Sequence, residues 1–534
     1  MNDHIRELRT AMKKRGIRLF TAVTSDAHGS EYISEHDNAV EYISGFTGTN
    51  GKTAVTEEEA FLWTDGRYFI QAEYELEGSG IKLMKTGEPG FPSFEEWCSA
   101  AESANPTALP DDIYEEVIDE IWPDRPARPS NPIWIHDISM AGRSAKEKLS
   151  LVYEKMKEEG CEEIYVNALD DIAWVLNLRG SDIPYNPVFY SFLSLQSGGA
   201  GTLYLQSASL NDDVRKHLSD LGIQIAEYGK FEKKKIYSDI ISRIKTHKTD
   251  DELSHMRESG LRDGVYMTKF IFWLKKQMSE GKDIDEIDAS DYLDGLRASD
   301  PLYVSLSFPT ISAYGTNAAI VHYHAQDKTK KKLKPKGLYL VDSGGQYLDG
   351  TTDVTRTVAL GPLTDEEKKN YTLVVTGMLR ALNKKFTLPL KSTVIDMCAR
   401  EMLTARGLDF NHSTGHGVGY FGYVHESPAG ISRKKLTDSG KAPRPEYVFT
   451  GGEIVSDEPG VYIEGSHGIR IENMIAVREG SFENLTWVPL EREALDVTLM
   501  TDEDIRNFDS YQNEVRRRIS PYLTEEERNR INEI

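Results

Sequence analysis

Four carboxylates and one imidazole lie on strand-like segments between residues 342 and 472: Asp342, Asp353, His416, Glu458 and Glu472. Buried together, such charges need a partner of opposite sign, and two divalent cations would neutralise them. Oxygen-rich donors with one nitrogen and no thiolate favour Mn²⁺, with Co²⁺, Mg²⁺ or Zn²⁺ as alternatives, over a closed structural zinc site. Two such ions can share a hydroxide and hold it against a carbonyl carbon.

Asp342 and Asp353 stand eleven positions apart, on two β-rich segments joined through glycines. A hairpin with a glycine-bearing turn can bring both carboxylates to one place. Because Asp342 precedes Ser-Gly, ordinary turn formation is the alternative role for this residue.

Three histidines lie within 14 positions of a glycine-rich segment: His412, His416 and His425. The spacing of the first two would suit a helical zinc pair, but Gly415 and Gly417 disfavour a helix there. We therefore predict extended backbone, which lets a ligand approach closely. Hydrogen-bonded structural histidines are the alternative interpretation.

A strand predicted over residues 468–477 carries two charges on one face. Ile469 and Ile471 flank Arg470 and Glu472, so the charged residues share the other face by the alternation of strand side chains. If that face is buried, each charge needs a partner. A surface salt bridge between the two is the alternative.

The elements that must position these residues follow two patterns. Residues 5–16 read as a helix and 17–23 as a strand, and after a proline-rich stretch at 122–132 a second helix–strand alternation begins at 144–167. Thr249 and Glu252 resemble a capping box that opens a helix to about residue 276. Beyond it, helices alternate with glycine-bounded hairpins, so we expect two α/β units and then an α+β unit.

Length and composition bound the class of protein. The chain has 534 residues, about three domains' worth, and a net charge of −23, which argues against a nucleic-acid partner. Its three cysteines show no CxxC spacing and exclude a disulfide framework. No apolar run approaches the roughly 18 residues of a membrane span and no export signal is visible, so we expect a soluble, cytoplasmic protein.

With these segments in view, the sequence resembles the pita-bread metallopeptidases, specifically the three-domain aminopeptidase P (Xaa-Pro aminopeptidase) branch. The ordered set of similar segments is more specific than any one of them. In the last part of the chain these segments are residues 317–323, 342–357, 412–428, 457–460 and 468–473. In the earlier parts they are residues 30–32, 44–48, 63–69 and 169–189.

The resemblance implies roles for nine residues. Asp342, Asp353, His416, Glu458 and Glu472 would ligate a dinuclear centre, with Asp353 and Glu472 bridging the ions. The remaining catalytic positions implied by the resemblance are His322, His412, His425 and Arg470. His425 would contact the scissile carbonyl, Arg470 would support the ligating carboxylates, and Glu458 would also shuttle a proton.

The implied activity is release of the N-terminal residue from peptides with proline second, by attack of a metal-bridging hydroxide on the scissile carbonyl. The resemblance implies two divalent ions, with Mn²⁺ expected and Co²⁺ or Zn²⁺ as alternatives. The expected partners are an Xaa-Pro peptide and a second copy of the chain, with neither nucleic acid nor membrane.

The resemblance divides the chain at residues 1–133 (creatinase-like α/β), 134–240 (a second, shortened creatinase-like α/β domain) and 241–534 (pita-bread catalytic domain). Compared with relatives, the stretches 99–122 and 228–250 are short, which puts the full sheets of the first two domains in question. Around His425, Gly422-Tyr423 and Ser427-Pro428 also depart from the family pattern.

Three alternatives remain at this point. A prolidase would have a similar metal site but cleave Xaa-Pro dipeptides. A non-catalytic pita-bread binding module, or a metal-free creatinase-like hydrolase, would have no need of five complete ligands. The ligand set therefore favours a metallopeptidase.

Overall fold

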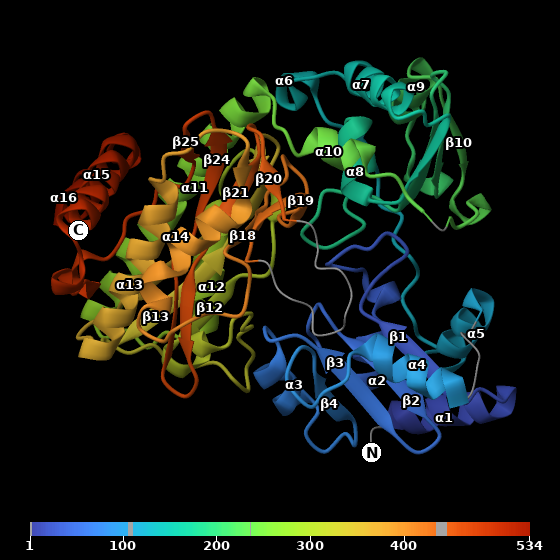
Figure 1. Cartoon of the computed structure of the whole chain (residues 1–534), viewed down its shortest axis with the longest axis horizontal. Coiled ribbons are helices and arrows are strands. Elements are labelled where there is room, and N and C mark those ends of the chain that lie inside the picture. The colour runs from blue at the N-terminus through green and yellow to red at the C-terminus, as the bar shows by residue number, and fades with distance from the viewer. Residues whose placement is uncertain (1–2, 105–109, 235, 434–445, 534) are drawn as a thin grey trace.

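The computed structural model describes residues 3–104, 110–234, 236–433 and 446–533. Figure 1 shows three units: a first in blue, a second in teal to light green, and a third that runs from green to red. Each unit is built around its own apolar core. Within the described ranges, no helix combines the length and apolar character that a membrane crossing requires.

The first unit is a four-stranded sheet flanked by helices. Strand order is β1-β2-β3-β4, antiparallel except for the parallel β3–β4 pair. The predicted helix–strand pair is confirmed as α1 and β1, and α1 buries Ile5, Leu8 and Met12 at helical spacing. The elements are α1 (Asp3–Arg15), β1 (Leu19–Val23), α2 (Ala39–Ser44), β2 (Lys52–Thr56), β3 (Ala60–Thr64), α3 (Phe69–Glu75), β4 (Lys82–Lys85), α4 (Phe94–Ala104) and α5 (Asp111–Ile121).

The second unit has a sheet of four strands in the order β10-β9-β8-β6 and a small β5–β7 pair. The predicted helix after Ser144 forms as α7, opened by a capping box between Ser144 and Glu147. The elements are β5 (Trp134–Ile135), α6 (Ile138–Ala141), α7 (Ala145–Glu158), β6 (Glu163–Val166), α8 (Leu169–Val175), β7 (Leu178–Arg179), β8 (Ser191–Gln196), β9 (Gly201–Leu205), α9 (Asp212–Asp220), β10 (Ile223–Glu227) and α10 (Ile240–Lys245).

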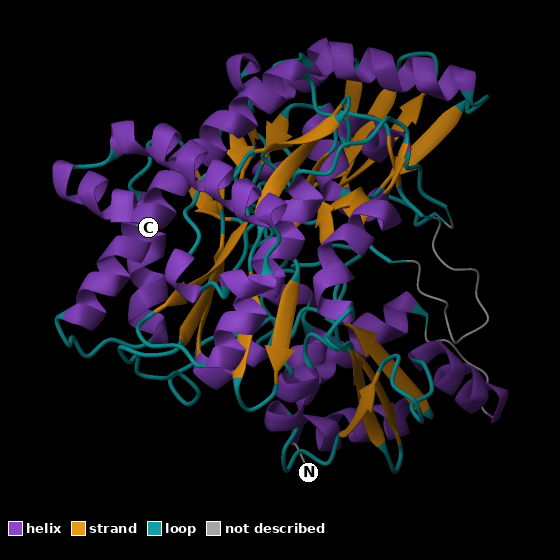
Figure 2. Ribbon diagram, turned by 60° about the vertical axis from the view of Figure 1, so that its left-hand side comes forward, coloured by secondary structure: helices purple, strands orange, loops and turns teal. Residues whose placement is uncertain are grey.

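The third unit surrounds short antiparallel sheets with six helices among its described residues. The predicted capping box is confirmed: Thr249 and Glu252 open α11, which is 30 residues long. The helices are α11 (Asp250–Ser279), α12 (Glu286–Ala298), α13 (Asp365–Leu382), α14 (Ser392–Thr404), α15 (Asp502–Ile519) and α16 (Glu525–Glu533). In Figure 2 the strands lie mainly inside the molecule, with helices along its outer surface.

The strands of the third unit form antiparallel ladders that bring distant segments side by side. Strand β13 pairs with both β12 and β16, and β18 pairs with β19 and β21. The strands are β11 (Tyr303–Leu306), β12 (Ile311–Tyr314), β13 (Leu338–Ser343), β14 (Gly345–Tyr347), β15 (Gly350–Thr351), β16 (Val354–Ala359), β17 (Leu390–Lys391), β18 (Gly415–Gly417), β19 (Glu426–Ile431), β20 (Val448–Phe449), β21 (Ile454–Asp457), β22 (Gly460–Ile463), β23 (His467–Arg470), β24 (Asn473–Arg478) and β25 (Ser481–Asn484).

Candidate active site

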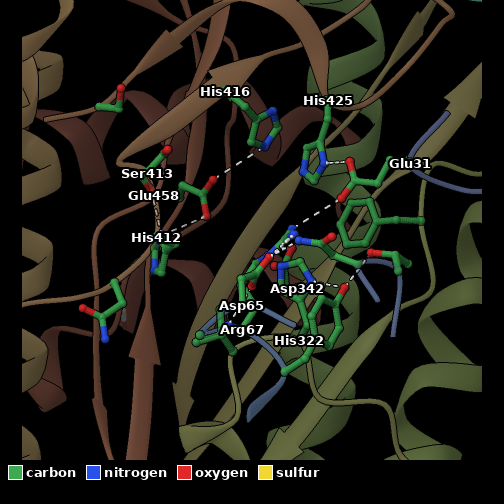
Figure 3. Close-up of a pocket in the computed structure, with 18 of the residues that line it drawn as sticks. Glu31, Asp65, Arg67, His322, Asp342, His412, Ser413, His416, His425 and Glu458 are labelled. Atoms are coloured by element: carbon green, nitrogen blue, oxygen red, sulfur yellow. Dashed lines mark hydrogen bonds and ion pairs between the residues drawn. The ribbon is translucent and has the colours of Figure 1, made fainter. Parts of the chain in front are cut away.

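One cavity of about 1060 Å³ opens between the first and third units. It gathers all nine residues that the sequence pointed to, and Figure 3 shows several of them converging. From the third unit the lining includes His322, Asp342, Asp353, His412, His416, His425, Glu458, Arg470 and Glu472. The first unit contributes Glu31, Asp65, Arg67 and Tyr68.

The centre of the cavity is a cluster of carboxylates around His416. Ligand atoms of Asp353, His416 and Glu472 all lie within 4.8 Å of one another. His416 Nε2 is 3.2 Å from Asp353 Oδ2 and 3.6 Å from Glu458 Oε1. This spacing allows the side chains to act together as ligands of one small metal centre.

Strand pairing explains why these residues meet. In the β13–β16 ladder Asp342 faces Thr355, two residues after Asp353, so the predicted hairpin brings the two carboxylates close. The tight turn at Gly344 requires glycine, because a Cβ there would lie 1.9 Å from the Thr352 carbonyl oxygen.

A second glycine, Gly415, lets the strand that carries His416 approach β21 closely. The predicted extended backbone is confirmed as β18, and a Cβ on Gly415 would lie 1.9 Å from the Ser456 carbonyl oxygen. This close approach places His416 beside Glu458, which follows β21.

The crowded carboxylates are electrostatically strained. Burial raises the pKa values of Asp353, Glu458 and Glu472 well above the ordinary range, and the neighbouring carboxylates raise them further. Cations bound among these side chains would remove both penalties.

Arg470 anchors one side of the cluster. Its Nη2 and Nε donate to Asp342 Oδ2 at 2.6 and 3.2 Å, and its Nη1 donates to the Tyr462 hydroxyl at 2.8 Å. The partner of Arg470 is therefore Asp342, and a surface salt bridge to Glu472 is not formed. The single strand predicted over residues 468–477 is wrong: it is two strands, β23 and β24, interrupted at residues 471–472 and paired in different sheets. Thr355 Oγ1 donates to Glu472 Oε2 at 2.7 Å, which orients that carboxylate as well.

The donor set fits a pair of divalent ions. The buried Oδ1 atom of Asp342 has no hydrogen-bond partner among the described residues, although Oδ2 of the same group is held by Arg470. A buried carboxylate oxygen without a donor calls for a ligand. Its neighbours are oxygen donors and the imidazole of His416, which are ligand types that Mn²⁺ accepts.

The other three predicted histidines line the cavity with distinct partners. His322 Nδ1 is 3.0 Å from the Tyr68 hydroxyl, and burial lowers the His322 pKa well below its usual value. His412 Nε2 is 2.8 Å from the Tyr462 hydroxyl, and burial lowers its pKa to about 3. The rings of His425 and His416 are edge to face with centroids 4.2 Å apart.

Glu31 of the first unit is a site residue that sequence reasoning gave no role. Its Oε2 contacts His425 Nδ1 directly, and its Oε1 lies 3.4 Å from Arg67 Nη1 (Figure 3). Burial raises the pKa of Glu31, but the charge and hydrogen bond of His425 and the charge of Arg67 lower it to about 2. The only signal in the sequence was the similarity of residues 30–32 to the family.

Comparisons with known proteins agree with this arrangement along the whole chain. Residues 254–479 match metallopeptidase family M24, and residues 480–531 match the C-terminal region of that family. Residues 4–109 and 124–258 each match a creatinase/prolidase N-terminal domain. The expected fold class, two creatinase-type α/β domains followed by a pita-bread domain, is confirmed.

Relatives of similar length carry one name. A "Probable Xaa-Pro aminopeptidase P" of Paracoccidioides brasiliensis is 35% identical, covering 98% of this chain and 97% of the relative. One from Neurospora crassa is 35% identical over 98% of this chain and 86% of its own length. The solved X-prolyl aminopeptidase of Caenorhabditis elegans, described as a cytosolic enzyme with a di-nuclear active site, superimposes with a TM-score of 0.91 at 30% identity, covering 99% and 98% of the two chains.

Similarity at this level extends through all three units, so it covers the ligand-bearing strands and the N-terminal units alike. The chain therefore belongs to metallopeptidase family M24, in the branch of the Xaa-Pro aminopeptidases P.

Proposed function

We propose that this protein is a metal-dependent aminopeptidase that releases the first residue of peptides with proline in second position. The observation that carries the proposal is the meeting, in one cavity, of the four-carboxylate cluster with His425 and with Glu31 of the first unit. The names of its full-length relatives support the same substrate class.

Two divalent ions would be held by Asp342, Asp353, His416, Glu458 and Glu472. When bound, they supply Lewis-acid activation of the scissile carbonyl and of a water molecule. We propose Mn²⁺ as the resident ion, with Co²⁺ or Zn²⁺ as alternatives, because the donors are mainly oxygen. The di-nuclear site described for the worm enzyme supports the number of ions.

His425 would stabilise the charge that develops on the scissile carbonyl. Contact with Glu31 fixes Nδ1, so Nε2 is the ring nitrogen left to bond the substrate, since it makes no hydrogen bond to a described residue. Glu458, which is also a proposed ligand, borders the same cavity and would carry a proton toward the proline nitrogen.

Restriction to the first peptide bond would follow from the carboxylate of Glu31 at one end of the site. Glu31 offers a carboxylate to the free α-ammonium group of the substrate. An internal residue of a longer peptide has no such cation to bind this carboxylate. The proline ring brings no N–H to satisfy. Phe308, Ile311 and Val321 give the cavity an apolar lining suited to that ring, and Ile311 pairs with Asp342 in the sheet.

The remaining expectations are proposals about the whole molecule. We propose a cytosolic homodimer divided at residues 1–133, 134–240 and 241–534. The cytosolic worm enzyme supports the location, and the separate cores support the number of units. Ile133 and Ile241 pack in the core of the second unit, so that unit also includes α10.

The decisive test is release of the free N-terminal amino acid from an Xaa-Pro-Xaa tripeptide by EDTA-stripped protein, with and without Mn²⁺. The matching Xaa-Pro dipeptide runs beside it. Mn²⁺-dependent cleavage of the tripeptide with little cleavage of the dipeptide is expected. Cleavage of the dipeptide alone would make the protein a prolidase, and no cleavage of either by metal-loaded protein would refute both assignments.

A further inference from the structure

Arg179 of the second unit holds the backbone that leads to His425. Its Nε donates to the Phe421 carbonyl at 2.8 Å and its Nη2 to the Tyr420 carbonyl at 3.4 Å. Nη1 donates to the carbonyls of Ala173 and Leu178, at 2.9 and 3.0 Å. The guanidinium therefore bridges β7 and α8 of the second unit to a loop of the third.

Arg179 is a buried cation whose hydrogen-bond partners are backbone carbonyls. Arg179 is 2% exposed, and within the described part of the chain the hydrogen bonds of its guanidinium group all go to backbone carbonyls. Burial lowers its pKa to about 10. An apolar side chain would fill the same space without the penalty of burying a charge. What the guanidinium provides in return is a rigid array of donors that fixes several carbonyls at once.

The loop that Arg179 holds is strained. Phe421 has φ of 42°, a left-handed conformation that is uncommon for a bulky residue and persists only when surrounding contacts impose it. The next residue is fixed from the other side, because Gln346 Nε2 donates to the Gly422 carbonyl at 2.7 Å and Gly422 N donates to Thr351 Oγ1 at 3.2 Å. His425 follows three residues later.

The second unit reaches the other side of His425 as well. The side chain of Glu426 is buried and contacts Lys248 directly, with Lys245 Nζ at 3.4 Å. Lys245 in turn contacts Asp170 of α8 directly, and its Nζ is 3.1 Å from Asp171. His425 thus lies between two attachments to the same helix of the second unit.

We propose that Arg179 is a positioning residue that sets the location of His425 relative to His416 and Glu31. Arg179 does not line the cavity, so it would act only through the loop. By this route the second unit takes part in turnover without touching substrate. The functional part of the inference rests on the proposed aminopeptidase activity, whereas the geometric part does not.

The test compares R179M and R179K with wild type, all loaded with Mn²⁺. R179M should lower kcat about 10- to 100-fold on the tripeptide, because misplacement by about 1 Å costs on the order of 100-fold. Metal content should stay at the wild-type value and KM should change less than kcat. R179K retains one donor group and should recover part of the loss.

K148M is the matched control. Lys148 is also a buried basic residue of the second unit, but its hydrogen bonds go to Trp174 and Asn177 within that unit. Its replacement should lower the melting temperature and leave kcat within about two-fold of wild type. Equal losses of kcat in R179M and K148M at equal loss of stability would overturn the proposal.

Two further readouts separate positioning from general damage. In an H425A background, R179M should add less than about three-fold, because the group that it positions is gone; full additivity would refute the route through His425. A crystal structure of R179M, or of R179K if R179M does not fold, should show the His425 ring displaced by at least about 0.5 Å relative to His416. An undisplaced ring would overturn the inference even if the protein proved inactive on proline peptides. Failure of the proposed function, in contrast, would be seen in the wild-type assay.

Discussion

Replacing Glu31 by glutamine tests whether the first unit contributes to turnover. The change keeps the shape of the side chain and removes its charge, so His425 loses a charged hydrogen-bond partner. Such a bond contributes about 1.5–3 kcal/mol. The second contact, to Arg67 at 3.4 Å, is long for a hydrogen bond and should contribute less than the contact with His425.

Solvent access places the expected loss at the lower end of that range. The Glu31 side chain is 30% exposed, so water can replace part of the interaction. About 1.5–2 kcal/mol corresponds to a loss of roughly 10- to 30-fold in kcat/KM, since 1.36 kcal/mol is a factor of ten. If Glu31 also binds the α-ammonium group of the substrate, part of the loss will be a higher KM.

The assay is tripeptide cleavage by Mn²⁺-loaded E31Q, with metal content measured on the same sample. E59Q is the matched control, because Glu59 belongs to the same unit but pairs with Lys82 at the surface. E31Q that stays within two-fold of wild type, with normal metal content, would show that the contact with His425 has no part in catalysis.

Further predictions concern the metal cluster and the histidines. D353N should lower turnover more than about 100-fold without unfolding the protein, since even residues that only support a metal site contribute about 10- to 100-fold; full activity in a metal-saturated sample would remove Asp353 from the site. H425A should lower kcat more than metal content, and if added Mn²⁺ restored the full rate, His425 would be structural. Y68F removes the hydroxyl beside His322 and should cost about two- to ten-fold in kcat/KM, with unchanged kinetics as the contrary result. After metal removal, the melting temperature should fall as pH rises above about 4. The reason is that the folded state keeps the protons of the buried carboxylates to higher pH than the unfolded chain does. Thermal denaturation of the metal-free protein, measured beside the Mn²⁺-loaded form, checks this, and a melting temperature that does not change with pH would contradict the crowding of these charges.

Features governed by neighbouring residues could be predicted from the sequence. The capping box at Thr249 and the extended backbone around His416 depend on hydrogen bonds and glycine conformations within a few positions. The hairpin that joins Asp342 and Asp353 is likewise local, since the chain between β13 and β16 turns through the adjacent pair β14 and β15.

Contacts between units could not be predicted in this way. Glu31 meets His425 across 394 positions, and Arg179 meets Phe421 across 242. Neither pair has a period or spacing that marks it, because the contact depends on how separately folded sheets pack together. The partner of Arg470 could not be predicted either, since alternation fixes which face a strand residue occupies but not which strand lies opposite.

The proposed metal ligands and the residues that hold His425 come from different units. All five proposed metal ligands belong to the third unit and are joined by its own ladders, so small shifts of the other units leave the cluster intact. His425 is different, because Glu31 holds its ring and Arg179 holds the loop that leads to it. Substitutions in the first two units should therefore separate turnover from metal content, whereas substitutions in the β13–β16 hairpin should change both together.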